Sequence, residues 1–233
     1  MASPSKTAPN RGVIHPFDLK YGTDTSGYLG PEELLNGRPS DAHNYGYSAI
    51  APSVFYEACR RWHETLPTVS GRTEAYSLID VGAGKGRALL LASELPFRRI
   101  VGVELSEDLM RVAQKNVARW KQAGRVRTKA KVRVLQADVL KFRWPRGPLL
   151  VYLYNPFACS LVAQMAERLA SVATSGGSRL VDMLYVNPTC ADTLARQGLF
   201  SRLWTARIEM SEADRKADPY GTTSDLVSAY RLK

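Results

Sequence analysis

The stretch Leu78-Ile-Asp-Val-Gly-Ala-Gly-Lys-Gly-Arg-Ala-Leu-Leu-Leu-Ala92 decides the fold class of this chain. Its apolar beginning is typical of a strand that is covered on both faces of a sheet. Gly82, Gly84 and Gly86 follow directly, and they let the backbone turn sharply and let a ligand approach the main chain. Residues from Ala88 onward begin a helix whose free N–H groups face that turn. The stretch therefore predicts a buried strand, a glycine turn and a helix in an α/β fold.

The spacing of the three glycines argues against two familiar nucleotide motifs. A dinucleotide site needs G-x-G-x-x-G, whereas here the spacing is G-x-G-x-G and Arg87 stands where the pattern needs glycine. The phosphate-binding pattern G-x-x-x-x-G-K-[ST] is absent. Asp80 lies two residues before Gly82, and its carboxylate would repel a pyrophosphate and attract a cationic amino group.

Asp80-Val-Gly-Ala-Gly-Lys-Gly86 resembles motif I of the class I S-adenosylmethionine-dependent methyltransferases. The resemblance implies S-adenosylmethionine as the cofactor, with its amino-acid end held by Asp80, Gly82, Ala83 and Gly84. A packing turn in some other α/β protein is the alternative interpretation, since short glycine motifs also occur by chance.

A second acid follows the next apolar strand. Glu104 comes after Ile100-Val-Gly-Val103 and lies 18 residues beyond Gly86, near the distance at which Rossmann-like folds place a carboxylate on ribose hydroxyls. The segment also resembles the ribose-binding element of the same methyltransferases, which implies that Glu104 and Leu105 contact the cofactor. Capping of the following helix is the alternative role for Glu104.

A third acid, Asp138, ends the apolar stretch that begins at Val132. It resembles the element that contacts adenine in this family, where the acid accepts a hydrogen bond from the amino group of the base. Val139 would then donate its backbone N–H to the ring. Helix capping again remains the alternative.

Asn155-Pro156-Phe157 ends the fourth predicted strand, where ligands bind in open α/β sheets. It resembles motif IV of amine-directed methyltransferases, although the usual second proline is missing. The resemblance implies that Asn155 and Phe157 are catalytic and that Asn155 also borders the cofactor. The Asn155 side-chain oxygen or the Pro156 carbonyl would accept amine hydrogens, and Phe157 would pack on the cation. A strand-ending turn is the alternative.

The order of strands and helices predicts a Rossmann-like, seven-stranded mixed sheet with an antiparallel C-terminal hairpin formed by residues 199–210 and 226–232. We divide the chain into a disordered tail (1–15), an N-terminal arm or lid with a helix (16–72), and an S-adenosylmethionine-binding domain (73–233). Tyr21 and Tyr47 lie in the arm and are expected to cover the cofactor if the arm is a lid. An arm that wraps permanently around the domain explains the same composition.

The chain is basic, with a formal net charge of +10 and a pI of about 9.6. Residues 109–137 contain nine cations and no acid, which favours a partner with an anionic surface, a protein or another macromolecule, with nucleic acid included. No apolar run of 18 residues and no secretory leader are apparent, so we expect a cytoplasmic protein that does not cross a membrane. The scattered cysteines, Cys59, Cys159 and Cys190, suit reduced thiols, and no metal site is expected.

Three functions remain open from the sequence. The first is N-methylation of an amine, of the protein-lysine type, by direct SN2 transfer. The second is methylation of a nucleic acid or a small molecule. The third is cofactor binding without catalysis, or a nicotinamide-dependent oxidoreductase.

Overall fold

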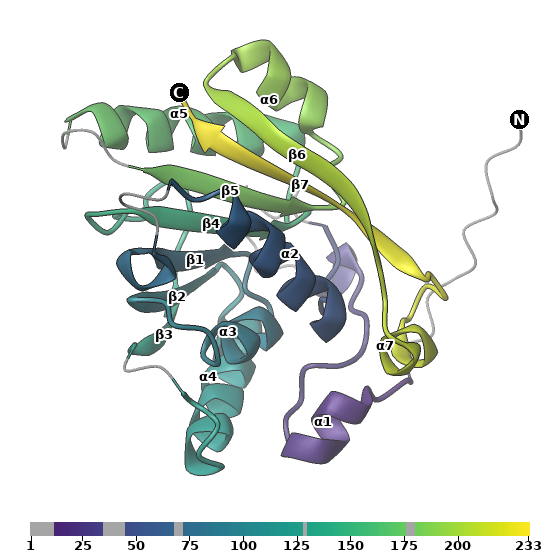
Figure 1. Cartoon of the computed structure of the whole chain (residues 1–233). Helices are drawn as coiled ribbons and strands as arrows, with labels where there is room; N and C mark the ends of the chain where they lie inside the picture. The colour runs from purple at the N-terminus through teal and green to yellow at the C-terminus, as the bar shows by residue number, and fades with distance from the viewer. Residues whose placement is uncertain (1–11, 35–44, 68–71, 128–129, 176–179) are drawn as a thin grey trace, which may run out of the picture.

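The computed structural model describes residues 12–34, 45–67, 72–127, 130–175 and 180–233. A seven-stranded sheet runs through its centre in the order β3-β2-β1-β4-β5-β7-β6 (Figure 1). Strands β1 to β5 run parallel to one another, and β7 runs antiparallel to both of its neighbours, β5 and β6. The predicted mixed sheet with an antiparallel C-terminal hairpin is confirmed. The strands are β1 (Ser77–Val81), β2 (Arg99–Glu104), β3 (Val132–Gln136), β4 (Leu149–Tyr154), β5 (Val181–Val186), β6 (Phe200–Glu209) and β7 (Ser224–Leu232).

Helices cover both faces of the sheet and create two hydrophobic cores. Helices α2, α3 and α4 pack on one face, and α5 and α6 pack on the other (Figure 1). Successive strand residues alternate between the faces, so Leu78 belongs to the first core and Ile79 to the second. The helices are α1 (Pro16–Tyr21), α2 (Pro52–Glu64), α3 (Arg87–Ala92), α4 (Glu107–Gln122), α5 (Cys159–Ser175), α6 (Ala191–Gln197) and α7 (Glu212–Ala217), with short 3-10 turns at Pro31–Leu34 and Thr73–Ala75.

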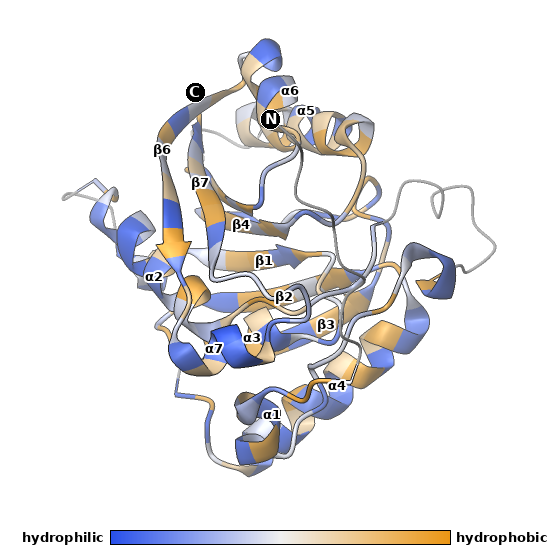
Figure 2. Cartoon of the chain, turned by 90° about the vertical axis from the view of Figure 1, so that its right-hand side faces the viewer, coloured by the Kyte–Doolittle hydropathy of each residue, from blue (hydrophilic) through white to orange (hydrophobic). Residues whose placement is uncertain are grey.

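Helix α4 shows how the sequence pattern produces this layering. Apolar and polar residues alternate along it in Figure 2, as expected of a helix with one face on a sheet. Ala113 and Trp120 are buried on the sheet side. Ser106 caps its N-terminus by accepting a hydrogen bond from the Leu109 N–H, a role for which serine is well suited.

Helix α2 begins at Pro52, which suits the first helical position, and the hydroxyl of the next residue, Ser53, donates to Asp214. The segment before β7 contains α7, which Ser211 caps. Strand β3 ends at Gln136, two residues before the acid Asp138 at which the sequence analysis ended it.

The described part of the N-terminal arm packs against α3, α4 and α7. His15 caps α1 by accepting the Phe17 N–H, and its other ring nitrogen lies 2.8 Å from Asp214 Oδ1. His15, the last residue of the expected tail, is buried. Residues 1–11 lie outside the described chain. Asp18 is also buried, and its carboxylate accepts hydrogen bonds from hydroxyl groups of Thr23, Thr25 and Ser26.

The cysteines also differ from expectation. Cys159, at the start of α5, forms a disulfide with Cys190, just before α6, and their Cα atoms are 5.2 Å apart. The two residues are 31 positions apart in sequence, and only the adjacency of β4 and β5 brings them together. Cys59 is a buried free thiol.

Two absences hold for the described ranges. No helix there combines the length and the hydropathy that crossing a bilayer requires. The same residues contain no cluster of three or more histidine, cysteine or acidic side chains that could hold a metal ion.

Candidate active site

An open pocket with about 830 Å³ of empty space, including the solvent space at its mouth, lies at the carboxyl ends of β1, β2 and β4. It is the place that the fold rule for open α/β sheets indicates. The lining residues come from the arm, the glycine turn and the ends of β2, β3 and β4: Leu34, Tyr45, Gly46, Tyr47, Ser48, Val81, Gly82, Gly84, Val103, Glu104, Leu105, Ser106, Leu109, Ala137, Asp138, Val139, Tyr154, Pro156, Phe157 and Leu161.

The glycine turn cannot carry side chains. Gly82 and Gly84 have φ angles of +72° and +55°, in the left-handed region. A Cβ on Gly82 would lie 2.5 Å from Pro156 Cβ, and one on Gly84 would lie 2.3 Å from the Tyr47 ring. Both the backbone conformation and the close neighbours therefore require glycine.

Glu104, at the end of β2, is hydrogen-bonded to the backbone of the glycine turn. One carboxylate oxygen accepts the Gly84 N–H at 2.7 Å, and the other accepts the Ser106 N–H at 2.8 Å. Burial raises the pKa of Glu104, although these backbone hydrogen bonds offset part of that effect. The acid lines the cavity while its two oxygens keep further lone pairs for a ligand hydroxyl.

Asp80 is a second buried acid beside the same turn. It lines a smaller cavity of about 290 Å³, which shares Tyr47, Ser48 and Tyr154 with the main cavity. Burial and repulsion by Glu104 raise the pKa of Asp80 to about 8. No salt bridge within the described residues reaches either Asp80 or Glu104. Arg87 also lines the smaller cavity, but its salt bridge is with Asp18, so neither acid of the site has a cationic partner among the described residues.

The main cavity is also lined by the two residues expected around adenine, Asp138 and Val139, and by Leu105, which was expected beside the ribose. Asp138 Oδ1 accepts the Leu140 N–H at 2.9 Å, so the acid also stabilises the turn after β3. The structure therefore brings the residues expected at the ribose and the base into one cavity with the glycine turn.

The segment Asn155-Pro156-Phe157, directly after β4, contacts both the cavity and the loop after β5. Pro156 and Phe157 line the cavity, whereas Asn155 does not. Asn155 adopts a left-handed φ of +43°. Its Oδ1 accepts the Thr189 hydroxyl at 2.7 Å and the Tyr185 hydroxyl at 3.3 Å. The sequence analysis did not identify Thr189 and Tyr185 as donors to Asn155. The only local signal was that a second Asn-Pro pair, Asn187-Pro188, follows β5 in the same way.

The two arm tyrosines that were expected to cover the cofactor have different positions. Tyr47 lies over Gly84 in the cavity wall and donates its hydroxyl to the Thr25 carbonyl at 2.6 Å. Tyr21 does not reach the cavity. Its ring packs edge-on against Trp120 at a centroid distance of 4.6 Å, and its hydroxyl accepts a hydrogen bond from Arg125.

Two cations of the glycine turn itself hold the arm in place. Lys85 donates to the Asp24 carboxylate and to the Ser26 carbonyl, both at 2.9 Å. Arg87 is buried and donates to the Thr25 hydroxyl at 2.7 Å. Arg87 stands at the position where a dinucleotide motif has glycine, and its side chain binds the arm instead. The sequence signalled the departure from that motif but not its purpose.

Ala83 faces the smaller cavity with Asp80 rather than the main one. Of the residues that the sequence singles out around the cofactor, Asp80 and Ala83 therefore lie behind the turn. Asn155 lies beside the cavity and Tyr21 lies away from it.

No protein-family model matches the sequence, and no protein with a curated function matches it. Solved structures of similar fold include the N-methyltransferase NodS from Bradyrhizobium japonicum WM9 in complex with S-adenosyl-L-homocysteine. It has 12% identity, covers 76% of this chain and 87% of its own, and has a TM-score of 0.47. An rRNA methylase from Streptococcus thermophilus has 10% identity, coverage of 79% and 99%, and a TM-score of 0.47. A ribosomal protein L11 methylase from Lactobacillus delbrueckii subsp. bulgaricus has 14% identity, coverage of 77% of both chains, and a TM-score of 0.47.

The strand order and the antiparallel β7 give this chain a Rossmann-like α/β fold with a seven-stranded mixed sheet, and residues of the predicted motifs lie at the carboxyl ends of its parallel strands.

Proposed function

We propose that the protein is an S-adenosylmethionine-dependent methyltransferase. The observation that carries the proposal is the pair of buried acids, Asp80 and Glu104, beside a glycine turn that borders the pocket at the carboxyl ends of the strands. Buried acids without a cationic partner are costly. A ligand with positive charge and hydroxyl groups relieves that cost, and S-adenosylmethionine carries both an ammonium and a ribose. A dinucleotide pyrophosphate would add negative charge to the same place.

In this proposal the residues of the two adjoining cavities hold the parts of the cofactor. Glu104 and Leu105 would hold its ribose, and Asp138 and Val139 its adenine. Its amino-acid end would be held by the glycines, with Asp80 and Ala83 of the smaller cavity behind them. When bound, S-adenosylmethionine supplies an activated methyl group for direct SN2 transfer. The residues of this chain then need only to align the acceptor and exclude water.

The acceptor is proposed to be an amine, with protein lysine as the first candidate. Phe157 and Tyr154 line the cavity and offer apolar and aromatic surface to a cation. The Pro156 carbonyl accepts the Tyr45 N–H at 3.3 Å and has a second lone pair for an amine hydrogen. Asn155 Oδ1 is already engaged by Thr189 and Tyr185. In this proposal the two hydroxyl groups fix the orientation of the Asn155 amide, and Asn155 contributes to methyl transfer mainly through this fixed orientation.

A nucleic-acid amine is the second candidate acceptor. It is favoured by the excess of exposed cations on this +10 chain. No RNA- or DNA-binding module is recognisable in the sequence, so this candidate depends on charge alone.

The cofactor is tested first by calorimetry with S-adenosylmethionine and with NAD. Binding of S-adenosylmethionine alone is expected, and preferential binding of NAD would overturn the proposal. The reaction is then tested with methyl-labelled S-adenosylmethionine and a fractionated cell lysate. Label in bands that resist nuclease and disappear with protease supports the protein acceptor.

Label that disappears with nuclease moves the acceptor to nucleic acid, and label in the low-molecular-weight fraction moves it to a small molecule. Tight cofactor binding with no transfer in any fraction would leave a binding protein and contradict the enzymatic proposal.

A further inference from the structure

Cations gather at the edge of the sheet opposite to the cavity. Strands β1, β2, β3 and β4 are parallel, so the loops that lead into them all lie at one edge, which we call the amino edge. Each of these loops carries at least one exposed arginine or lysine. They are Arg72 before β1, Arg98 and Arg99 at the start of β2, Arg127 and Lys131 before β3, and Arg146 before β4. We call these six residues the basic edge.

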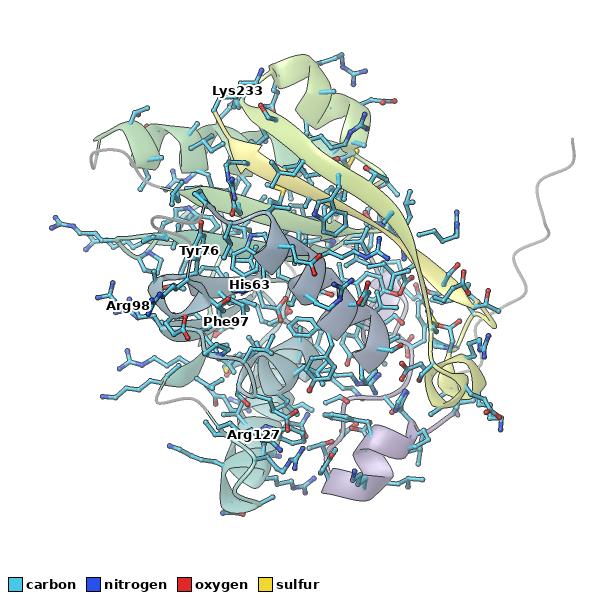
Figure 3. All side chains as sticks on the ribbon, viewed as in Figure 1. His63, Tyr76, Phe97, Arg98, Arg127 and Lys233 are labelled. Carbon is cyan, nitrogen blue, oxygen red and sulfur yellow. A yellow bond between two sulfur atoms is a disulfide. The ribbon has the colours of Figure 1, made fainter. Side chains whose placement is uncertain are left out.

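The six side chains come from neighbouring parts of the surface. The strand order β3-β2-β1-β4 sets their loops side by side, across about 14 Å at the usual strand spacing. Arg98 and Arg127 line the same groove of about 780 Å³, and Figure 3 shows both on the side where the parallel strands begin. A Cβ on Gly147 would lie 3.5 Å from Arg98 Nη1, so this guanidinium also borders the loop into β4.

The basic edge lacks the acidic partners that neutralise many other cations of this protein. Arg60, Arg111, Arg125 and Arg231 each form a salt bridge with a carboxylate. Within the described residues, none of the six basic-edge side chains does. The groove contains two acids, Glu74 and Glu94, and Glu94 is held by Arg125 and by the Tyr56 hydroxyl. The surface therefore carries uncompensated positive charge, which attracts polyanions.

We propose that the basic edge binds the phosphate backbone of a nucleic acid. Five of the six residues are arginines, whose planar guanidinium matches phosphate oxygens in a bidentate way and stays charged at any physiological pH. The aromatic residues next to the groove, such as Phe97 and Trp62, are buried and offer no stacking platform. Binding through the backbone alone is therefore independent of base sequence and strongly dependent on salt.

This binding surface is distinct from the methyl-transfer cavity. The strands that separate the two edges have five or six residues, or about 17–20 Å at the usual rise per residue. Phosphates on the basic edge thus lie far from the carboxyl-edge cavity. The surface tethers a nucleic acid, or a nucleoprotein particle that contains the acceptor, and does not itself present the methylated group.

The test is fluorescence anisotropy with a fluorescein-labelled 30-nucleotide single-stranded RNA, measured over a series of salt concentrations. If all six cations contact phosphates, the logarithm of the binding constant falls against the logarithm of salt with a slope of about −4. The triple variant Arg98→Gln, Arg99→Gln, Arg127→Gln is expected to bind more weakly, with a slope of about −2. The matched control replaces Arg168, Arg202 and Arg215, which are exposed elsewhere, by glutamine.

The control is expected to keep the wild-type slope and affinity. Equal losses in the two triple variants would overturn the proposal, because they would show a response to net charge alone. Competition by poly-L-glutamate at the same charge concentration, as strong as that by unlabelled RNA, would also overturn it and indicate an acidic protein partner.

Calorimetry with S-adenosylmethionine measures the cofactor site separately, so that failure of this proposal can be distinguished from failure of the proposed function. Unchanged cofactor affinity in the triple variant, together with weakened RNA binding, supports two separate sites. If the triple variant does not fold, the pair Arg72→Gln and Arg146→Gln removes cations from two other loops without changing the groove. It is expected to make the slope shallower by about 1.4, and an unchanged slope would overturn the proposal.

Discussion

The two edges of the parallel sheet carry opposite and differently placed charges. At the carboxyl edge, Asp80 and Glu104 are buried acids without a cationic partner in the described chain. At the amino edge, the six cations of the basic edge are exposed and lack carboxylate partners there. Burial makes the acids costly and selective for a small ligand that fits the cavity. Exposure leaves the cations hydrated and suited to a large polyanion.

Because the acids are buried and the cations are exposed, the two edges should differ in how much they affect protein stability. A buried uncompensated acid lowers the stability of the ligand-free protein until a ligand neutralises it, whereas an exposed cation changes stability little. Substitutions at the carboxyl edge should therefore alter both folding and ligand binding, and substitutions at the amino edge should alter binding alone.

The largest expected effect is the pH dependence of Asp80→Asn. Unfolded Asp80 ionises near pH 3.8, but the folded carboxyl has a pKa of about 8, so the wild-type free energy of unfolding falls as pH rises between these values. Asparagine resembles the protonated acid throughout. Its advantage should grow by about 1.4 kcal/mol per pH unit, to a total on the order of 5 kcal/mol by pH 8.

Denaturant unfolding at pH 5, 6, 7 and 8 measures this difference. The exposed acid Asp108, changed to asparagine, is the control and should give a pH profile parallel to wild type. Parallel profiles for Asp80→Asn as well would refute the raised pKa. The same variant should bind S-adenosylmethionine more weakly, because asparagine cannot ionise to pair with the ammonium.

A smaller effect is expected from Gly84→Ala. The left-handed φ and the contact with the Tyr47 ring should together lower the free energy of unfolding by about 2–5 kcal/mol. Gly124, after α4, has a similar φ of +67°, but a Cβ added there would meet only open space. Gly124→Ala should therefore cost only about 1–2 kcal/mol. Equal costs in denaturant unfolding would show that the Tyr47 contact yields without strain.

Glu104→Ala should weaken S-adenosylmethionine binding by about 1.5–3 kcal/mol, as expected for hydrogen bonds to a charged group. Calorimetry measures the loss. Glu74, the exposed acid in the groove at the amino edge, provides the matched variant Glu74→Ala, which should bind the cofactor like wild type. An unchanged affinity for Glu104→Ala would remove Glu104 from the cofactor site.

The smallest expected effect concerns Asn155. Asn155→Gly removes the side-chain amide, and glycine tolerates the left-handed φ. The rate of methyl transfer should fall about tenfold, which corresponds to the free energy of about one hydrogen bond. Cofactor affinity should stay nearly intact. Asn187→Gly is the matched control, since Asn187 also precedes proline with a φ of +48° but hydrogen-bonds to Asp225. Equal loss of transfer and cofactor affinity in Asn155→Gly would mean that Asn155 is structural.

The sequence by itself determined the features that lie within contiguous segments. The strand, glycine turn and helix of residues 78–92 follow from apolar patterning and from the freedom of glycine, which act over a few residues. Glu104 and Asp138 were identified because each ends an apolar strand, and parallel strands bring their carboxyl ends to one edge. The seven-stranded order followed from the succession of elements and from the family resemblance.

Tertiary structure alone decided which distant segments meet. Arg87 pairs with the arm, Cys159 bonds to Cys190, and the Asn155 amide is held by Thr189. Each of these contacts joins segments far apart in sequence, and no local pattern encodes the distance between them. Tyr21 and Tyr47 have similar local surroundings in the sequence, yet packing against Trp120 draws one away from the cavity that the other covers. The basic edge likewise exists because strand order sets four separate loops side by side.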